Sequence, residues 1–105
     1  MLTKATKIYA ANVRGLVKNL KVIHTLNLET YDVLLFSEIW SIKEYENVVI
    51  NSFELKTKYQ RDSRGGGVAI FTKKGLKTDT LNPVVNNGIT EAVGIRLAIY
   101  FQSRG

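Results

Sequence analysis

Two side chains suited to metal or phosphate chemistry each follow a short apolar segment. Glu38 follows the apolar run at residues 33–36 after a single serine, and Asn12 lies near the end of the segment TKIYAANV. An unpaired buried carboxylate is costly, and α/β sheets place ligand-binding groups at the carboxyl ends of strands. One carboxylate can hold Mg²⁺, whose other ligands are water and phosphate oxygens. Glu38 is therefore a candidate metal ligand, and a surface glutamate that begins a loop is the alternative interpretation.

Asn12 would lie at the same sheet edge as Glu38 if their two segments are neighbouring parallel strands. An amide there can orient the carboxylate or donate a hydrogen bond to a phosphate oxygen without adding charge. Arg14 and Gly15 follow it directly. The alternative is that Asn12 helps to cap the helix that follows.

The histidine and the glycines favour simpler interpretations. His24 is the only histidine, and it falls on the flank of a predicted helix, out of reach of Asn12 and Glu38, so no catalytic triad is predicted. The glycines at 65–67 match neither GxxxxGK[ST] nor GxGxxG, and an apolar strand follows them. We expect them to open that strand where another backbone passes close by.

The first 40 residues predict a βαβ-type unit. Residues 6–13 indicate a strand, and residues 31–40 indicate a second strand that is buried on both faces. Between them, Leu16, Leu20 and Ile23 share one face of an amphipathic helix of about three turns, ending near 27–29. The second strand should run parallel to the first.

The pattern changes after Trp40. Ser41 and Glu44 have the spacing of a capping box for a short helical turn. Residues 53–60 alternate apolar and polar side chains, and with residues 66–73 they predict an antiparallel hairpin.

Residues 74–90 are predicted to be mainly loop, with one weak strand at 76–80. Turn signals occur at Asn82-Pro83 and Asn87-Gly88. A last strand is expected at 91–101. The predicted class is α/β in the first part and mostly antiparallel β in the rest (α+β).

Composition limits the classes of partner. The chain has 105 residues, the size of a single domain, with 45% hydrophobic residues and no cysteine. The absence of cysteine excludes a disulfide framework and a thiolate metal site, and it is compatible with an intracellular location. No apolar run approaches the ~20 residues that span a bilayer. The net charge of +6 favours a polyanionic partner such as nucleic acid.

Three motifs in order resemble a known family. They are NVRGL at 12–16, YDV through SEIW at 31–40, and Arg61 with RGGGVAIF at 64–71. Together they resemble the amino-terminal half of the endonuclease/exonuclease/phosphatase superfamily, in its LINE-type (non-LTR) retrotransposon branch. The resemblance covers about residues 7–74. It implies one partial domain over 1–105, a partial four-layer α/β sandwich of the deoxyribonuclease-like type, with a mixed sheet and a flanking helix.

The resemblance also implies a function and its residues. Members cut phosphodiester bonds with Mg²⁺, so Glu38 would be the metal-binding glutamate and Asn12 the active-site asparagine. Arg14, Arg61 and Arg64 would contact the target DNA duplex, and the place of action would be intracellular, in the nucleus.

The family pattern also contains an Asp-x-Asn pair and an Asp-His pair that these residues lack. We therefore expect the chain to be catalytically incomplete, and its sheet faces to be partly uncovered and able to self-associate. The alternatives are a non-catalytic basic module that binds nucleic acid, and a fragment of a phosphoesterase of the same superfamily.

Overall fold

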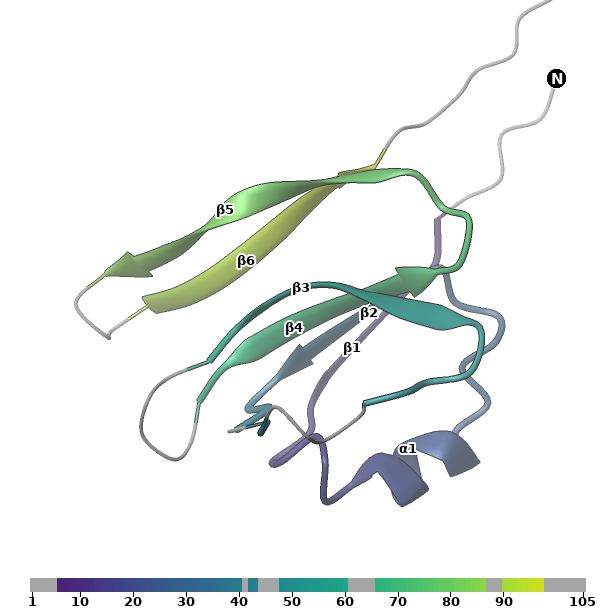
Figure 1. Cartoon of the computed structure of the whole chain (residues 1–105). Coiled ribbons are helices and arrows are strands. Elements are labelled where there is room, and N and C mark those ends of the chain that lie inside the picture. The colour runs from purple at the N-terminus through teal and green to yellow at the C-terminus, as the bar shows by residue number, and fades with distance from the viewer. Residues whose placement is uncertain (1–5, 41, 44–47, 61–65, 87–89, 98–105) are drawn as a thin grey trace, which may run out of the picture.

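Six strands and one short helix make up the computed structural model, which describes residues 6–40, 42–43, 48–60, 66–86 and 90–97 (Figure 1). In chain order the elements are β1 (Ile8–Asn12), α1 (Leu20–Thr25), β2 (Val33–Ser37), β3 (Phe53–Tyr59), β4 (Val68–Lys73), β5 (Thr78–Asn86) and β6 (Thr90–Leu97). The predicted α/β or α+β class is confirmed. The predicted capping box at Ser41 and Glu44 lies outside the described residues, as does the turn at Asn87-Gly88.

The main sheet is mixed and has the strand order β1-β2-β4-β3. β1 runs parallel to β2, which confirms the βαβ-type unit, and Asn12 is the register partner of Ser37. β4 is antiparallel to both β2 and β3, so the hairpin predicted at 53–60 and 66–73 is also confirmed. β5 and β6 form a separate antiparallel pair. After β2 the chain continues to β3 at the sheet edge, and β4 then returns between β3 and β2, which brings distant segments to the same sheet end.

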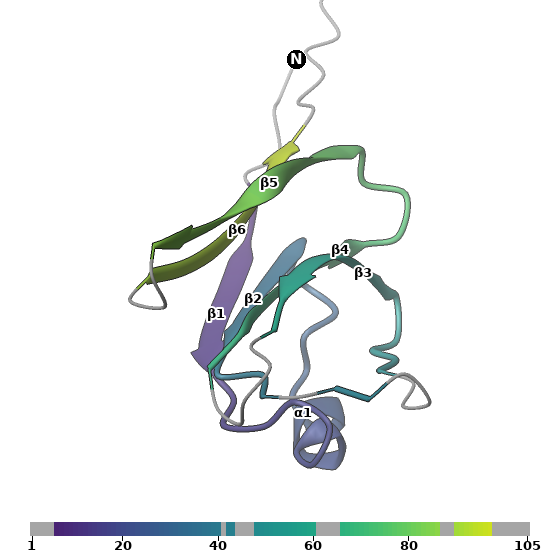
Figure 2. The same cartoon turned by 60° about the vertical axis from the view of Figure 1, so that its left-hand side comes forward.

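The two faces of the main sheet are covered differently. α1 lies on one face, and the β5–β6 hairpin lies on the other against β3 and β4 (Figures 1 and 2). Side chains alternate along each strand. The residues of the helix side form the main core, with Phe36 and Phe71 in edge-to-face contact at 5.8 Å between ring centroids.

The outer face of β1 is less covered. Alternate residues of β1 are exposed, and Ile8 keeps 52% of its surface accessible. On the same side of the sheet, Val33 of β2 and Ile70 of β4 are buried. The hairpin therefore protects this side of the sheet over β3 and β4, whereas β1 keeps exposed side chains. Self-association through this face remains a prediction.

The helix is shorter than the sequence predicts. Instead of about three turns, α1 has six residues, and residues 16–19 form tight turns with an i→i+3 bond from the Leu20 N–H to the Val17 carbonyl at 3.3 Å. At the other end, the Thr25 hydroxyl donates to the Val22 carbonyl and the next residue is extended. The amphipathic pattern is nevertheless confirmed, because Ile23 is buried and Lys21 is exposed.

The predicted loop at 74–90 is wrong in its main part. β5 is a nine-residue strand, longer than the weak strand expected at 76–80. The Asn82-Pro83 turn signal falls inside β5, where the pairing with β6 shifts register between Leu81 and Val84. Proline has no N–H to donate to a ladder, and strands accept it at edges and bulges. Here the proline marks an irregularity within a strand and does not end it.

Candidate functional site

Three segments that are far apart in the sequence meet at one end of the main sheet. The first follows β1, the second follows β2 and the third precedes β4. The Gly15 N–H donates to the Glu38 carbonyl at 2.8 Å, and the Trp40 N–H donates to the Gly66 carbonyl at 2.9 Å. The backbone pairing of the sheet therefore continues into these loops. We call the set the strand-end cluster: residues 12–16, 38–40 and 66–67.

The backbone of the strand-end cluster is strained. Among the described residues, four non-glycine residues have positive φ, and three of them lie here: Arg14 at 47°, Glu38 at 56° and Trp40 at 63°. Such conformations cost on the order of 1–3 kcal/mol each and persist only where the surroundings hold them in place. Strain of this kind gathers at functional sites. The side chains of Glu38 and Trp40, both in the second segment, are thus directed by an unusual backbone conformation.

Glu38 is half-buried at the carboxyl end of β2, as predicted from the sequence. Its Oε1 accepts a hydrogen bond from the Trp40 indole Nε1 at 3.4 Å. A carboxylate offers about four acceptor positions. One long hydrogen bond leaves this group ample capacity for a cation, so the chemistry of Glu38 fits a metal ligand.

Asn12 lies at the same sheet end, next to Ser37 in register, and its side chain is exposed. Its Oδ1 accepts a hydrogen bond from the Arg14 N–H at 3.3 Å, which stabilises the turn after β1. Because α1 begins only at Leu20, Asn12 is not its cap. The Nδ2 group of Asn12 is the part of this side chain that can donate to a phosphate oxygen.

Trp40 is a component of the cluster that the sequence analysis did not single out. Its ring lies against Gly15, where an added Cβ would stand 2.9 Å from the indole Cε3 atom. The Lys18 ammonium lies over the ring at 4.6 Å from the centroid. Lys18 and Gly15 therefore hold the indole between the loop after β1 and the carboxylate of Glu38. Trp40 is part of the SEIW motif, but its contacts could not be predicted from the sequence because they depend on two strained loops.

Asn19 is the second residue that sequence reasoning missed. Its Nδ2 donates to the carbonyls of Val13, Arg14 and Gly15, at 2.9, 3.1 and 3.1 Å. It occupies the N-cap position of α1 without a side-chain capping bond. The amide instead stabilises the loop that carries Arg14 and contacts Trp40.

Asn19→Ala should lower the free energy of unfolding by about 1–2 kcal/mol, because two donors to three carbonyls are lost. The measurement is urea unfolding followed by the fluorescence of Trp40, the only tryptophan. Asn27→Ala is the matched control. Asn27 is exposed and lies beyond α1, so this change should cost less than about 0.5 kcal/mol. Equal losses in the two variants would show that the Asn19 bonds do not stabilise the loop.

Of the three arginines predicted to contact DNA, the structure describes only Arg14. Arg14 is exposed in the strand-end cluster, two residues after Asn12. Arg61 and Arg64 lie outside the described residues, in the segment between β3 and β4.

Gly67 follows that segment, and its surroundings confirm the predicted close approach, because an added Cβ would stand 2.8 Å from Ile39 Cγ1 and 3.0 Å from the Tyr59 carbonyl oxygen.

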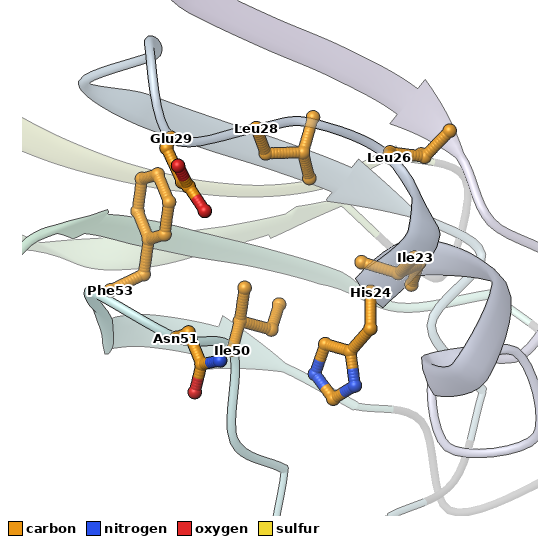
Figure 3. A pocket seen from close by; sticks show the side chains of 8 residues that line it. All are labelled: Ile23, His24, Leu26, Leu28, Glu29, Ile50, Asn51 and Phe53. Carbon is orange, nitrogen blue, oxygen red and sulfur yellow. The ribbon is translucent and has the colours of Figure 1, made fainter.

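A small pocket lies elsewhere, between α1 and the segments that lead into β2 and β3 (Figure 3). It has a volume of ≈ 60 Å³ and is lined mainly by apolar side chains, with His24, Glu29 and Asn51 as its polar members. The His24 Nε2 group donates to the Val49 carbonyl at 2.8 Å. His24 thus joins α1 to the chain before β3, away from Asn12 and Glu38, as the sequence predicted.

Within the described part of the chain, no group of three or more His, Cys, Asp or Glu side chains is arranged to hold a metal ion. No helix among the described residues is long and apolar enough to cross a membrane. Comparison with models of protein families, with curated proteins and with solved structures found no match. The candidate site therefore depends on its own geometry, with Glu38 as its one carboxylate.

Proposed function

We propose that this chain is the amino-terminal half of a Mg²⁺-dependent DNA endonuclease domain of the non-LTR retrotransposon type, within the endonuclease/exonuclease/phosphatase superfamily. One observation carries the proposal. The strand order β1-β2-β4 brings residues 12–16, 38–40 and 66–67 to one end of the sheet. These segments belong to the three motifs on which the resemblance depends. The sequence pattern predicts that the first two lie at one sheet edge, and the pairing of β4 with β2 adds the third.

The layers support the same proposal. A mixed sheet carries a helix on one face and a β-hairpin on the other (Figure 2). This arrangement is what half of a four-layer α/β sandwich would contain: one helical layer, one complete sheet and the first strands of a second sheet. The exposed side chains of β1 lie on the side that a larger second sheet would cover.

In the proposed site, Glu38 is the residue that would hold Mg²⁺. The bound ion would supply positive charge that stabilises the transition state of phosphodiester cleavage. The Asn12 amide would donate to a phosphate oxygen, and Arg14 would contact a neighbouring phosphate. Arg61 and Arg64 have the chemistry for the same task. The chain's own contribution is therefore to bind and orient the DNA backbone.

A single carboxylate and one amide do not position metal, water and leaving group together. The 105 residues also have no Asp-His pair, since the single histidine is His24, between Ile23 and Thr25. We therefore propose that these residues alone bind Mg²⁺ weakly and do not nick DNA efficiently. Efficient Mg²⁺-dependent nicking of plasmid DNA by this chain, lost in Glu38→Ala, would contradict the proposed incompleteness.

Glu38→Gln should reduce Mn²⁺ binding by roughly tenfold or more, because a neutral amide replaces the one carboxylate of the site. Mn²⁺ takes the same oxygen ligands as Mg²⁺, and its binding can be measured by water-proton relaxation. Glu29→Gln is the matched control, because Glu29 is an exposed carboxylate beside the pocket, away from the strand-end cluster. Equal binding by wild type and Glu38→Gln would rule out Glu38 as the ligand.

The net charge of +6 favours a second candidate, a basic module that binds nucleic acid without catalysis. On this hypothesis, affinity for DNA falls steeply with salt and does not change with Mg²⁺ or with Glu38→Gln. The endonuclease hypothesis instead predicts that Mg²⁺ strengthens DNA binding by wild type and not by Glu38→Gln. Affinity that does not depend on salt would exclude the basic module.

A further inference from the structure

The indole of Trp40 connects the proposed metal ligand to the loop after β1. Its Nε1 group donates to Glu38 Oε1 at 3.4 Å, while the ring lies against Gly15 and beneath the Lys18 ammonium. Both Glu38 and Trp40 have positive φ, so neither side chain lies where an ordinary extended strand would place it. The contact between Trp40 and Glu38 therefore depends on the strained backbone of this turn.

We infer that Trp40 is a positioning residue for Glu38: its indole N–H holds one carboxylate oxygen and leaves the other available to bind a cation. The inference rests on the proposed function, because it assumes that Glu38 is the metal ligand. Groups that hydrogen-bond a ligating carboxylate orient it, and their loss typically costs 10–100-fold in metal affinity. The role of Trp40 is to orient Glu38, and it does not itself ligate the metal.

The surroundings of Trp40 suit this role. The ring packs against Gly15, where an added Cβ would stand 2.9 Å from Cε3, so a residue with a side chain at this position would displace the indole. Lys18 lies over the ring at 4.6 Å, and a cation over tryptophan is attracted to the ring face. Asn19 holds the backbone carbonyl of Gly15 at 3.1 Å. The loop after β1 thus fixes the ring, and the ring orients Glu38.

The contact can be tested without metal, because Trp40 supplies the only indole N–H signal in the NMR spectrum of this chain. Glu38→Gln should shift this signal, since a charged acceptor is replaced by a neutral one. Glu29→Gln is the control and should leave the signal in place. An indole signal that does not change in Glu38→Gln would overturn the positioning role.

The effect on metal binding is tested with Trp40→Phe, which keeps an aromatic ring and removes the N–H group. We expect Mn²⁺ binding to weaken by about tenfold, at the lower end of the usual range because the hydrogen bond is long. Tyr31→Phe is the matched control. Tyr31 also has a lysine over its ring, Lys7, but it precedes β2 at the opposite end of the sheet. This variant should bind Mn²⁺ as wild type does.

Lys18→Met provides a second variant in case Trp40→Phe disturbs folding. It keeps the indole and removes the cation above it, and we expect Mn²⁺ binding to weaken by about two- to fivefold. Lys7→Met removes the same charge from the pair at the other sheet end and should have no effect. The amide spectrum of each variant shows whether it is folded.

The outcomes separate the two proposals. If wild type binds Mn²⁺, Glu38→Gln does not, and folded Trp40→Phe binds as wild type does, Glu38 is the ligand and the positioning role of Trp40 is wrong. If wild type fails to bind Mn²⁺, the metal role of Glu38 is wrong, and the role of Trp40 fails with it. Weakened binding in Trp40→Phe and Lys18→Met, with both controls unchanged, is the result that the positioning role requires.

Discussion

Gly67→Ala is expected to lower the free energy of unfolding by about 2–5 kcal/mol. Gly67 has φ of +89°, a conformation that costs a residue with a Cβ about 1–2 kcal/mol. The new Cβ would also stand 2.8 Å from Ile39 Cγ1 and 3.0 Å from the Tyr59 carbonyl oxygen. Ile39 is fully buried and the Tyr59 atom is a backbone carbonyl oxygen, so neither neighbour moves easily. Overpacking of this kind adds about 1–3 kcal/mol.

Gly75→Ala is the matched control for Gly67→Ala. Gly75 has φ of +91°, but an added Cβ would meet nothing within 4 Å. It should therefore show the backbone cost alone, about 1–2 kcal/mol. Urea unfolding followed by circular dichroism measures both variants, and their difference isolates the close approach at Ile39. Equal losses would mean that the strand-end cluster relaxes around the new methyl group.

Phe71→Ala is expected to cost about 3–5 kcal/mol in the free energy of unfolding. Phe71 is 1% exposed on β4, the strand between β2 and β3, and its ring meets that of Phe36. The change leaves a cavity in the main core. Because small domains are stable by only about 5–15 kcal/mol, the variant should unfold at much lower urea concentration.

Leu55→Ala is the control for Phe71→Ala. Leu55 is the register partner of Phe71 on β3 but is 39% exposed, so its truncation should cost about 1 kcal/mol. Phe71→Leu is a milder variant that remains measurable if Phe71→Ala does not fold. A loss for Phe71→Ala no larger than that for Leu55→Ala would show that the main core is not centred on this ring.

The sequence predicted the sheet and the placement of Glu38 because these depend on strong local patterns. The apolar run at 33–36 fits a strand buried on both faces, and a carboxylate just after that strand was expected at the sheet end. The parallel pairing of β1 and β2 followed from the helix predicted between them. The close backbone approach expected at the glycines before β4 was correct at Gly67.

The remaining features depend on contacts that no local pattern contains. The helix is shorter than predicted because Leu16 to Asn19 form tight turns and Asn19 directs its amide to the preceding loop. β5 is longer than the strand predicted at 76–80 because Asn82-Pro83 was interpreted as a turn, whereas Pro83 lies at an irregularity inside the strand. The role of Trp40 could not be predicted either. Its contact with Glu38 requires positive φ at both residues, which only the assembled loops impose.

The position of β2 in the sheet has a consequence for how the molecule folds. β2 has no partner nearby in the sequence: Val33 pairs with Ile8 on one side and with Thr72 on the other. Such pairings close long loops, and chains dominated by them fold slowly. β3 and β4 can form a hairpin early, but the strand-end cluster needs β1, β2 and β4 together. The contacts among Glu38, Trp40 and Gly15 need only the β1–β2 pairing, whereas Gly66 and Gly67 join them through the pairing of β2 with β4. We therefore expect the complete strand-end cluster to form only after both long loops have closed.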